Sequence, residues 1–269
     1  MPLAVCATPI GNLGDVTQRV IEELRTAELV LCEDTRHTRR LLERHGIDAR
    51  LLSFHEHNEA ERTLEIVKRL EAGKRIALVS DAGMPAISDP GSRLIRASLA
   101  AGVEVTVLPG PSAVETALVA SGLVGDRYTF IGFLPRRSGE LEALWEDLRG
   151  VAWPVVAFES PKRLPASLRS LAVAAPDREV AVCRELTKRF EEIVRGPALE
   201  VAARFADAPK GEVTLVLGPG HEVRQGDDLA VEVDAVAQLV AAGASRKVAA
   251  EVVSRLTGVS RNKLYRASL

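Results

Sequence analysis

Short apolar runs recur along the first half of the chain, and stretches with apolar residues at helical spacing separate them. The runs predict buried strands at Leu3–Ala7, Leu29–Cys32, Arg50–Phe54, Arg75–Val79 and Val103–Leu108. The stretches between them predict helices at Val16–Thr26, Thr38–Arg44, Glu59–Glu71 and Arg93–Ala101. Alternating strands and helices are typical of a parallel sheet with helices on both faces. We therefore expect an α/β fold with a doubly wound parallel sheet in this half.

The second half keeps the apolar strands but has fewer helices than strict alternation requires. Strands are predicted at Thr129–Phe133, Pro154–Glu159, Glu179–Arg184, Glu191–Arg195 and Glu212–Gly218, and helices at Gly139–Leu148, Leu164–Val173 and Ala198–Arg204. Fewer helices favour a mixed sheet, because parallel neighbours need a long crossover and antiparallel ones do not. We expect a first domain over 1–122, a second over 123–220 and a tail over 221–269, with a hinge at Gly122–Asp126.

The tail differs in character from the rest of the chain. A helix is expected over Asp234–Leu239, and Ala244–Arg266 has the pattern helix, glycine-containing turn, helix, which is helix-turn-helix spacing. From Arg246 onward it carries six Lys or Arg residues against one Glu. This segment is therefore a candidate RNA-binding or subunit-binding element, and a small helical cap with a solvated charged face is the alternative.

Polar loops follow several of the predicted strands, and the richest is Ser80–Gly91, the central loop. It contains Gly, Pro, Ser and Asp at the carboxyl end of a buried strand, where open α/β sheets bind ligands. Asp81 could meet a ribose hydroxyl or a cation, and Ser88 could cap the following helix. A purely structural turn is the alternative. The loop after the first strand has Gly11 and Gly14 but lacks the G-x-G-x-x-G fingerprint of dinucleotide sites.

Composition narrows the function classes further. The formal net charge is −2, so any contact with nucleic acid must come from local patches. Aromatic residues are 4% of the chain, too few for a broad base-stacking platform. Three widely spaced cysteines fit neither a disulfide framework nor a metal site, and no apolar stretch has the length of a membrane span. We expect a cytoplasmic protein with no leader, no membrane contact and no metal.

Seven motifs in order give the chain a family resemblance. They are Thr8–Asp15, Cys32–Arg36, Ser80–Pro85, Pro109–Ser112, Phe130–Pro135, Glu159–Arg163 and Arg184–Lys188. Together they resemble the tetrapyrrole-methylase-like class of S-adenosylmethionine enzymes, and within it the bacterial ribosomal small subunit methyltransferase I branch. The helical tail resembles the appendage of that branch. The resemblance implies a two-domain enzyme, usually a homodimer, that binds S-adenosylmethionine between its domains. It also implies 2′-O-methylation of a cytidine at the decoding centre of 16S ribosomal RNA, with either the free RNA or the small ribosomal subunit as the substrate.

The resemblance also suggests which residues hold the donor. For the donor they are Leu13, Asp81, Ala82, Gly83, Met84, Ile87, Ser112 and Ala113 from the first domain, and Phe158, Gly211 and Glu212 from the second. Basic residues that follow strand ends or interdomain loops could meet RNA phosphates, and Arg36, Lys162 and Arg184 among them also belong to the family motifs. The expected RNA-binding residues are Arg36, Arg39, Arg136, Lys162, Arg163, Arg184, Lys188 and Arg189. Solvated helix ends and surface ion pairs are the alternative for part of that set.

A ribose hydroxyl is a poor nucleophile, so a proton acceptor would help its attack. Glu33 and Asp34 are the first candidates, because they follow the second strand at the same edge as the central loop. Three histidines, His37, His55 and His57, compete with them, and Lys188 and Arg189 could instead stabilise developing negative charge. Positioning alone could also suffice. The rival functions are methylation of a tetrapyrrole or a protein side chain by the same fold, and a non-catalytic RNA-binding assembly factor.

Overall fold

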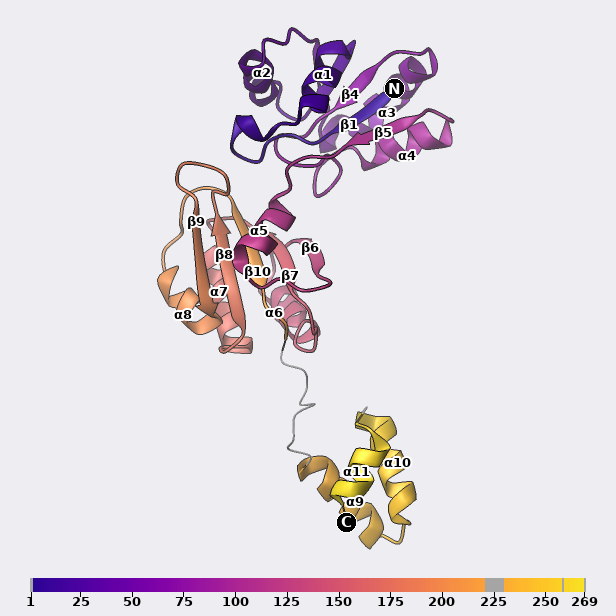
Figure 1. Cartoon of the computed structure of the whole chain (residues 1–269), viewed down its shortest axis with the longest axis vertical. Coiled ribbons are helices and arrows are strands. Elements are labelled where there is room, and N and C mark those ends of the chain that lie inside the picture. Colours follow the sequence, from indigo (N-terminus) through magenta and orange to yellow (C-terminus); the bar gives the residue numbers. More distant parts are fainter. Residues whose placement is uncertain (1, 221–229, 258, 269) are drawn as a thin grey trace. The chain divides into compact units, whose positions relative to one another are not determined.

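The structure is a computed structural model that describes residues 2–220, 230–257 and 259–268 (Figure 1). It contains two compact units. The first comprises Met1–Leu148 and Trp153–Gly220, and the second comprises Arg149–Ala152 and His221–Leu269. Two five-stranded sheets form the framework of the first unit, whereas helices form the second.

The first sheet is fully parallel and confirms the predicted doubly wound fold. Its strands are β1 (Leu3–Cys6), β2 (Leu29–Cys32), β3 (Leu51–Ser53), β4 (Ile76–Leu78) and β5 (Val105–Leu108), in the order β3-β2-β4-β1-β5. Helices α1 (Gln18–Thr26) and α2 (Thr35–Arg44) contribute to the core on one face of this sheet, and α3 (Glu56–Glu71) and α4 (Ser92–Ala100) to the core on the other (Figure 1). A short 3-10 turn, η1 (Leu13–Asp15), precedes α1. The three inner strands β1, β2 and β4 are apolar throughout, because both of their faces are buried.

Capping side chains set where these helices begin and explain the differences from the predicted ends. Helix α1 begins two residues later than predicted, because Thr17 accepts a hydrogen bond from the amide of Val20 at 3.3 Å. Helix α2 begins three residues earlier than predicted, because Asp34 accepts from the amide of Arg36 at 2.8 Å. The capping chemistry therefore outweighs the apolar periodicity at both helix starts.

The second sheet is mixed, as predicted. Its strands are β6 (Thr129–Phe133), β7 (Val155–Glu159), β8 (Glu179–Arg184), β9 (Glu192–Pro197) and β10 (Val213–Leu217), in the order β6-β7-β10-β8-β9. Only the β6–β7 pair is parallel among the pairs of this sheet that the structure describes, and the crossover between them carries α6 (Ser138–Asp147). Helices α7 (Leu164–Ala174) and α8 (Ala198–Arg204) complete this half.

Helix α5 (Ala113–Ser121) was not expected from the sequence. Its apolar residues lie on almost every side, so no polar face gives it a helical period. Val114, Ala117 and Leu118 pack with Val156 and Ala181 of the second sheet. A helix that precedes residue 122 thus belongs to the core of the second half. The division at 122 and the hinge at Gly122–Asp126 stay predictions.

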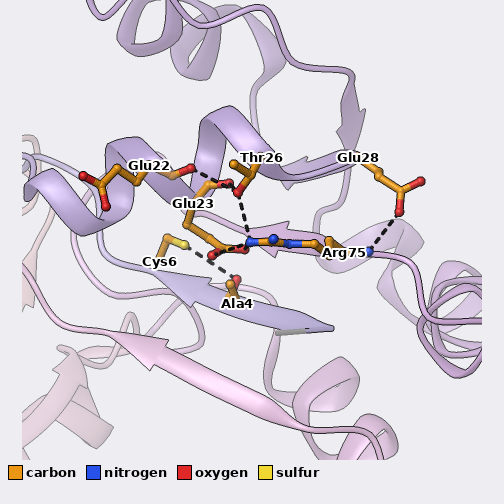
Figure 2. A network of polar contacts seen from close by, with 7 residues as sticks. All are labelled: Ala4, Cys6, Glu22, Glu23, Thr26, Glu28 and Arg75. Carbon is orange, nitrogen blue, oxygen red and sulfur yellow. Dashed lines mark hydrogen bonds and ion pairs between the residues drawn. The ribbon is translucent and has the colours of Figure 1, made fainter.

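A buried ion pair connects α1 to the start of β4 (Figure 2). The Glu23 side chain is 4% exposed, and both of its carboxylate oxygens accept from Nη2 of Arg75, at 3.2 and 3.1 Å. The same nitrogen donates to the hydroxyl of Thr26 at 2.9 Å. Beside this pair, burial and the charge of Glu23 raise the pKa of the Cys6 thiol to about 12. Cys6 therefore stays a neutral, unreactive thiol.

The second unit contains three helices in its described part, α9 (Ala230–Ala241), α10 (Arg246–Thr257) and α11 (Arg261–Ala267). They enclose a small apolar core of Val236, Ala249, Ala250, Val253 and Leu264. The two helices predicted within Ala244–Arg266 are confirmed, whereas the predicted turn residue Gly258 and the first nine residues of the tail, 221–229, lie outside the described residues. No helix in the described parts of either unit combines the length and apolarity needed to cross a membrane.

Candidate functional site

A cleft of about 920 Å³ opens within the first unit. Its lining comes from the loops after β4 and β5, from the start of α5, and from strands and loops of the second sheet. The lining includes Ile10, Ala82, Gly83, Met84, Ile87, Ser88, Asp89, Ser112, Ala113, Glu115, Tyr128, Phe130, Phe133, Phe158, Glu159, Leu186 and Glu212. This position, at the carboxyl edge of a parallel sheet, is where the fold class places its ligands. The cleft is the candidate functional site.

The central loop (Ser80–Gly91) forms one side of the cleft and is fixed to the loop after β1. Gly83 and Thr8 exchange backbone hydrogen bonds of 2.9 and 3.1 Å, and the Thr8 hydroxyl donates to the carbonyl of Ser80 at 3.0 Å. Ala86 and Ser88 both have left-handed backbone, with φ of 68° and 61°. Between them, Ile87 is left 50% exposed on the cleft. An exposed apolar side chain held on a strained loop is typical of a binding surface.

The predicted role of Ser88 as the cap of α4 is wrong. The residue before the helix is Gly91, with φ of 130°, and no side chain of the central loop caps it. Instead, Oε1 of Glu59 accepts from the amides of Gly91 at 3.1 Å and Arg93 at 3.0 Å. Glu59 belongs to α3, so the cap comes from a distant part of the sequence.

Aromatic side chains form the opposite side of the cleft. Phe158 contacts Phe130 and Phe133 edge to face, with ring centroids 4.9 and 5.4 Å apart. Phe133 is 60% exposed although it is large and apolar. Such a wall suits a flat apolar group, because edge-to-face aromatic contacts add to the free energy of apolar burial.

A polar group interrupts the apolar lining at the start of α5. Ser112 and Tyr128 both donate to the carboxylate of Glu115, Tyr128 at 2.6 Å. Burial raises the pKa of Glu115, but the two hydrogen bonds outweigh it and the net shift is downward. Glu115 is therefore an ionised acceptor on the cleft. Backbone amides and this carboxylate could orient a polar ligand.

The tip of the β8–β9 hairpin, Glu185–Glu191, packs against the loop that follows β1. The amide of Asn12 donates to the Thr187 hydroxyl at 3.0 Å. A Cβ at Gly11 would lie 2.7 Å from the Leu186 carbonyl oxygen, so this approach requires glycine. Glu185 and Thr187 have left-handed backbone, with φ of 54° and 64°. The hairpin tip is thus held rigidly while it contributes Leu186 to the cleft.

The structure brings most of the expected donor-binding residues together. Eight of them line the cleft, namely Ala82, Gly83, Met84, Ile87, Ser112, Ala113, Phe158 and Glu212. Leu13 and Asp81 instead line a separate small cavity, and Oδ1 of Asp81 accepts from the amide of Asp34 at 3.0 Å. Gly211 lies against the Glu185 carboxylate. The donor-binding roles of all eleven stay predictions.

Neither predicted proton acceptor is among the residues that line the cleft. Hydrogen bonds from the Arg36 side chain and amide lower the pKa of Asp34 to about 2, and the two side chains form an ion pair at 3.0 Å. Burial, then the charge of Asp81, raises the pKa of Glu33. Asp34 therefore holds protons weakly and Glu33 more strongly than an ordinary carboxylate. Their catalytic role stays a prediction.

The predicted RNA-binding residues fall into two groups. Arg36, Arg39, Arg136, Lys162 and Arg189 are exposed. The others have partners within the fold. Arg163 contacts Glu159 at 2.5 Å and the carbonyls of Leu134 and Pro135, Arg184 contacts Glu192 and the carbonyl of Lys210, and Lys188 contacts Glu185 and Glu212. The first group is free to meet phosphates without breaking a described ion pair, apart from Arg36.

Several cleft residues escaped the sequence reasoning. Phe130 and Phe133 stand in one of the quoted motifs, which was the available signal. Tyr128 and Glu115 had no signal, because their contact joins separate elements. Asp89 lay within the central loop but had no assigned role. Burial, then the charge of Glu33, raises the pKa of Asp89 to about 6, although a hydrogen bond with Ser80 opposes the shift.

The described residues contain no group of three or more His, Cys, Asp or Glu side chains that could hold a metal ion. Cys6, Cys32 and Cys183 are buried free thiols.

Comparisons with known proteins agree with this geometry. The model of the family Tetrapyrrole (Corrin/Porphyrin) Methylases matches residues 2–202, and that of the RsmI C-terminal HTH domain matches residues 227–269. Solved structures share the fold. Diphthine synthase has a TM-score of 0.65 at 16% identity, covering 80% of this chain and 89% of its own. Uroporphyrin-III C-methyl transferase from Thermus thermophilus, complexed with S-adenyl homocysteine, has a TM-score of 0.58 at 15% identity, covering 80% and 96%.

Curated relatives are similar over nearly the whole chain. Ribosomal RNA small subunit methyltransferase I of Mesorhizobium japonicum is 42% identical over 270 residues, which span 99% of this chain and 91% of that protein. The proteins of the same name from Synechocystis and Escherichia coli O157:H7 are both 41% identical, covering 99% of this chain and 97% and 94% of their own lengths. The chain is a methyltransferase and belongs to the ribosomal RNA small subunit methyltransferase I family of the tetrapyrrole methylases.

Proposed function

We propose that this methyltransferase transfers a methyl group from S-adenosylmethionine to the 2′-oxygen of a cytidine ribose in the RNA of the small ribosomal subunit. The donor is S-adenosylmethionine, whose sulfonium supplies an activated methyl group and is left as a neutral thioether. The observation that carries the proposal is the large, mainly apolar cleft at the carboxyl edge of the first sheet, in a chain of this family. The target nucleotide rests on the motif resemblance.

The cleft residues fit this donor. A cleft of about 920 Å³ is within the range of small-molecule sites. Ile87 and Phe133 stay exposed on it although both are apolar, so a bound adenosine moiety would remove unfavourable surface from water. Ser112, Glu115 and the amides at the start of α5 offer hydrogen bonds to the polar ends of the donor. We infer that Phe158 and the central loop hold the donor between them.

Methyl transfer to oxygen needs the acceptor oxygen in line with the carbon–sulfur bond, and it needs water kept out. The rigid attachment of the hairpin tip to Gly11 and Asn12 supports both requirements, because it closes one side of the cleft. The exposed side chains of Arg36, Arg39, Arg136, Lys162 and Arg189 supply positive charge for phosphate contacts. We infer that they position the RNA rather than select the nucleotide.

We also infer that the chain forms a homodimer, as the resemblance implies. Leu99 on α4 and Val107 on β5, an edge strand, are 58% and 53% exposed, which supports an apolar contact with a second copy. A mass near 58 kDa in sedimentation equilibrium, about twice the 28.9 kDa of one chain, would agree, whereas a monomer at micromolar concentration would contradict it.

Labelled-methyl transfer tests the proposed function. Small subunits that lack the modification are incubated with the chain and S-adenosylmethionine that carries a labelled methyl group. Label in the subunit RNA is expected. The Phe158→Ala variant should bind the donor at least about tenfold more weakly, because it removes the centre of the aromatic wall. Val173→Ala, an exposed change on α7, should leave binding unchanged. Donor binding without label in RNA would overturn the RNA substrate.

A further inference from the structure

Asp89 lies on the cleft and does not cap the helix that follows it. It stands two residues before Gly91, the residue that directly precedes α4. Here the cap of α4 comes from Glu59, through the amides of Gly91 and Arg93. Asp89 lines the cleft instead, together with Ile87 and Ser88. Helix capping therefore does not explain the placement of Asp89.

The backbone around Asp89 is fixed on both sides. Ala86 and Ser88, which precede it, both have a left-handed backbone φ. Residues other than glycine rarely adopt this conformation, and it persists only where the surrounding structure enforces it. After it, Gly91 has a φ of 130°, and a Cβ there would lie 2.8 Å from Cδ2 of Leu78. The central loop therefore presents the Asp89 carboxylate to the cleft in a defined position, which is what a reacting group needs.

The surroundings of Asp89 also suit it to accept a proton near neutral pH. It is half-buried, and the charges that face it are those of Glu33, from the loop after β2, and Asp81, from its own loop. Ser80 provides an opposing hydrogen bond. A carboxylate whose pKa is about 6 is a stronger base than Asp34, whose pKa is about 2 and which is paired with Arg36. A general base works best when its pKa is close to the working pH.

We propose that Asp89 is the catalytic residue that accepts the proton of the ribose 2′-hydroxyl during methyl transfer. The bond between the 2′-oxygen and the methyl carbon forms while the carbon–sulfur bond breaks, and its electron pair stays on sulfur. The hydroxyl proton moves to the Asp89 carboxylate, from which water removes it after the product leaves. The inference deepens the proposed function and rests on it. Glu33 then acts as a positioning residue, because its charge raises the basicity of Asp89.

The test compares Asp89→Asn and Glu33→Gln with the wild type. Asp48→Asn is the matched control, because exposed Asp48 precedes β3 and so lies at the opposite edge of the sheet. Methyl transfer to modification-deficient small subunits is measured in single turnovers from pH 5 to 8.5. Donor affinity is measured by calorimetry, and stability by urea denaturation at pH 4 and pH 8. The calorimetry and denaturation do not depend on turnover.

The inference predicts a distinct result for each variant. Asp89→Asn should transfer methyl at least about a hundredfold more slowly while binding the donor as tightly as the wild type. The wild-type rate should rise with pH through about 6, and Glu33→Gln should move this rise to lower pH. Because folding raises the pKa of Asp89, the wild type loses stability as the pH rises from about 4 to about 6. Asp89→Asn should therefore be more stable than the wild type at pH 8 and equally stable at pH 4.

Two results would overturn the inference. If the Asp89→Asn variant transfers methyl at the wild-type rate and with the wild-type pH profile, Asp89 takes no part in the reaction, and the proposed function stays intact. If the Asp89→Asn variant is less stable than the wild type at pH 8 and binds the donor poorly, Asp89 is a structural residue. A pH profile of methyl transfer that is the same in Glu33→Gln as in the wild type would support this structural role. If the wild type itself transfers no methyl to the subunits, the proposed function fails first and this inference falls with it.

Discussion

The ion pair between Glu23 and Arg75 gives a quantitative prediction about what holds the first sheet to its helices (Figure 2). Glu23 comes from α1 and Arg75 immediately precedes β4, so the pair joins elements far apart in sequence. Arg75→Met keeps most of the aliphatic stem and removes the guanidinium. The Glu23 carboxylate, 4% exposed, then loses two hydrogen bonds and its counter-charge, and Thr26 loses a donor.

The magnitude follows from how deeply each partner lies. Breaking a fully buried pair by removing one partner costs about 3–5 kcal/mol. Arg75 is 42% exposed, so water reaches part of the site and the cost is smaller, about 2–3 kcal/mol. For a chain of this size, that corresponds to a fall in Tm of about 4–12 °C. The double variant Glu23→Gln/Arg75→Met should recover about half of the loss, because no buried charge remains.

Urea denaturation followed by circular dichroism measures the loss. Arg137→Met is the matched control, because Arg137 pairs with Glu140 at a similar distance, 3.0 Å, with 85% of its side chain exposed. It should change the free energy of unfolding by less than about 0.5 kcal/mol. A loss below about 0.5 kcal/mol in Arg75→Met, equal to that of the control, would refute the argument from burial.

Three further predictions concern the cleft and the positively charged side chains. Gly11→Ala should weaken donor binding about tenfold, because its Cβ would lie 2.7 Å from the Leu186 carbonyl oxygen and displace the hairpin tip. Gly139→Ala is the control, because a Cβ at Gly139 would meet no atom within 4 Å. Equal donor affinities of the two variants would contradict the tight packing at Gly11. Arg39→Glu should weaken RNA binding and reduce its salt dependence without changing Tm. By contrast, Arg163→Met should cost about 2 kcal/mol of stability, because it leaves the buried Glu159 carboxylate without its counter-charge. If the variant loses RNA binding but no stability, Arg163 belongs to the RNA-binding surface.

The sequence patterns that are local predicted the fold well. Each strand of both sheets was expected within two residues of its observed position, because apolar runs and their flanking polar loops are read directly from neighbouring residues. Helix α5, which was not predicted, has apolar residues on nearly all sides, and its helical character depends on burial against the second sheet. The periodicity of apolar residues does not predict a helix that tertiary packing buries on nearly all sides.

The features of the site that depend on distant partners were not predictable in the same way. Ser88 has a side chain suited to capping, but Glu59 from α3 occupies that role. Arg163 stands in a family motif, yet its guanidinium contacts Glu159 and backbone carbonyls inside the fold. The raised pKa of Asp89 depends on burial and on the charge of Glu33, which lies 56 positions earlier in the chain. Residue type indicates what chemistry is available, and the tertiary contacts decide which residue performs it.

The most direct test of the proposed function is to map the methyl group that the purified chain adds to modification-deficient small subunits. The RNA is digested to nucleosides and to defined oligonucleotides, and mass spectrometry locates the added methyl group and its sugar or base position. We predict one modified nucleotide, a cytidine at the decoding centre, with the methyl group on the 2′-oxygen of its ribose. A methyl group on a base, on several nucleotides or on a ribosomal protein would contradict it.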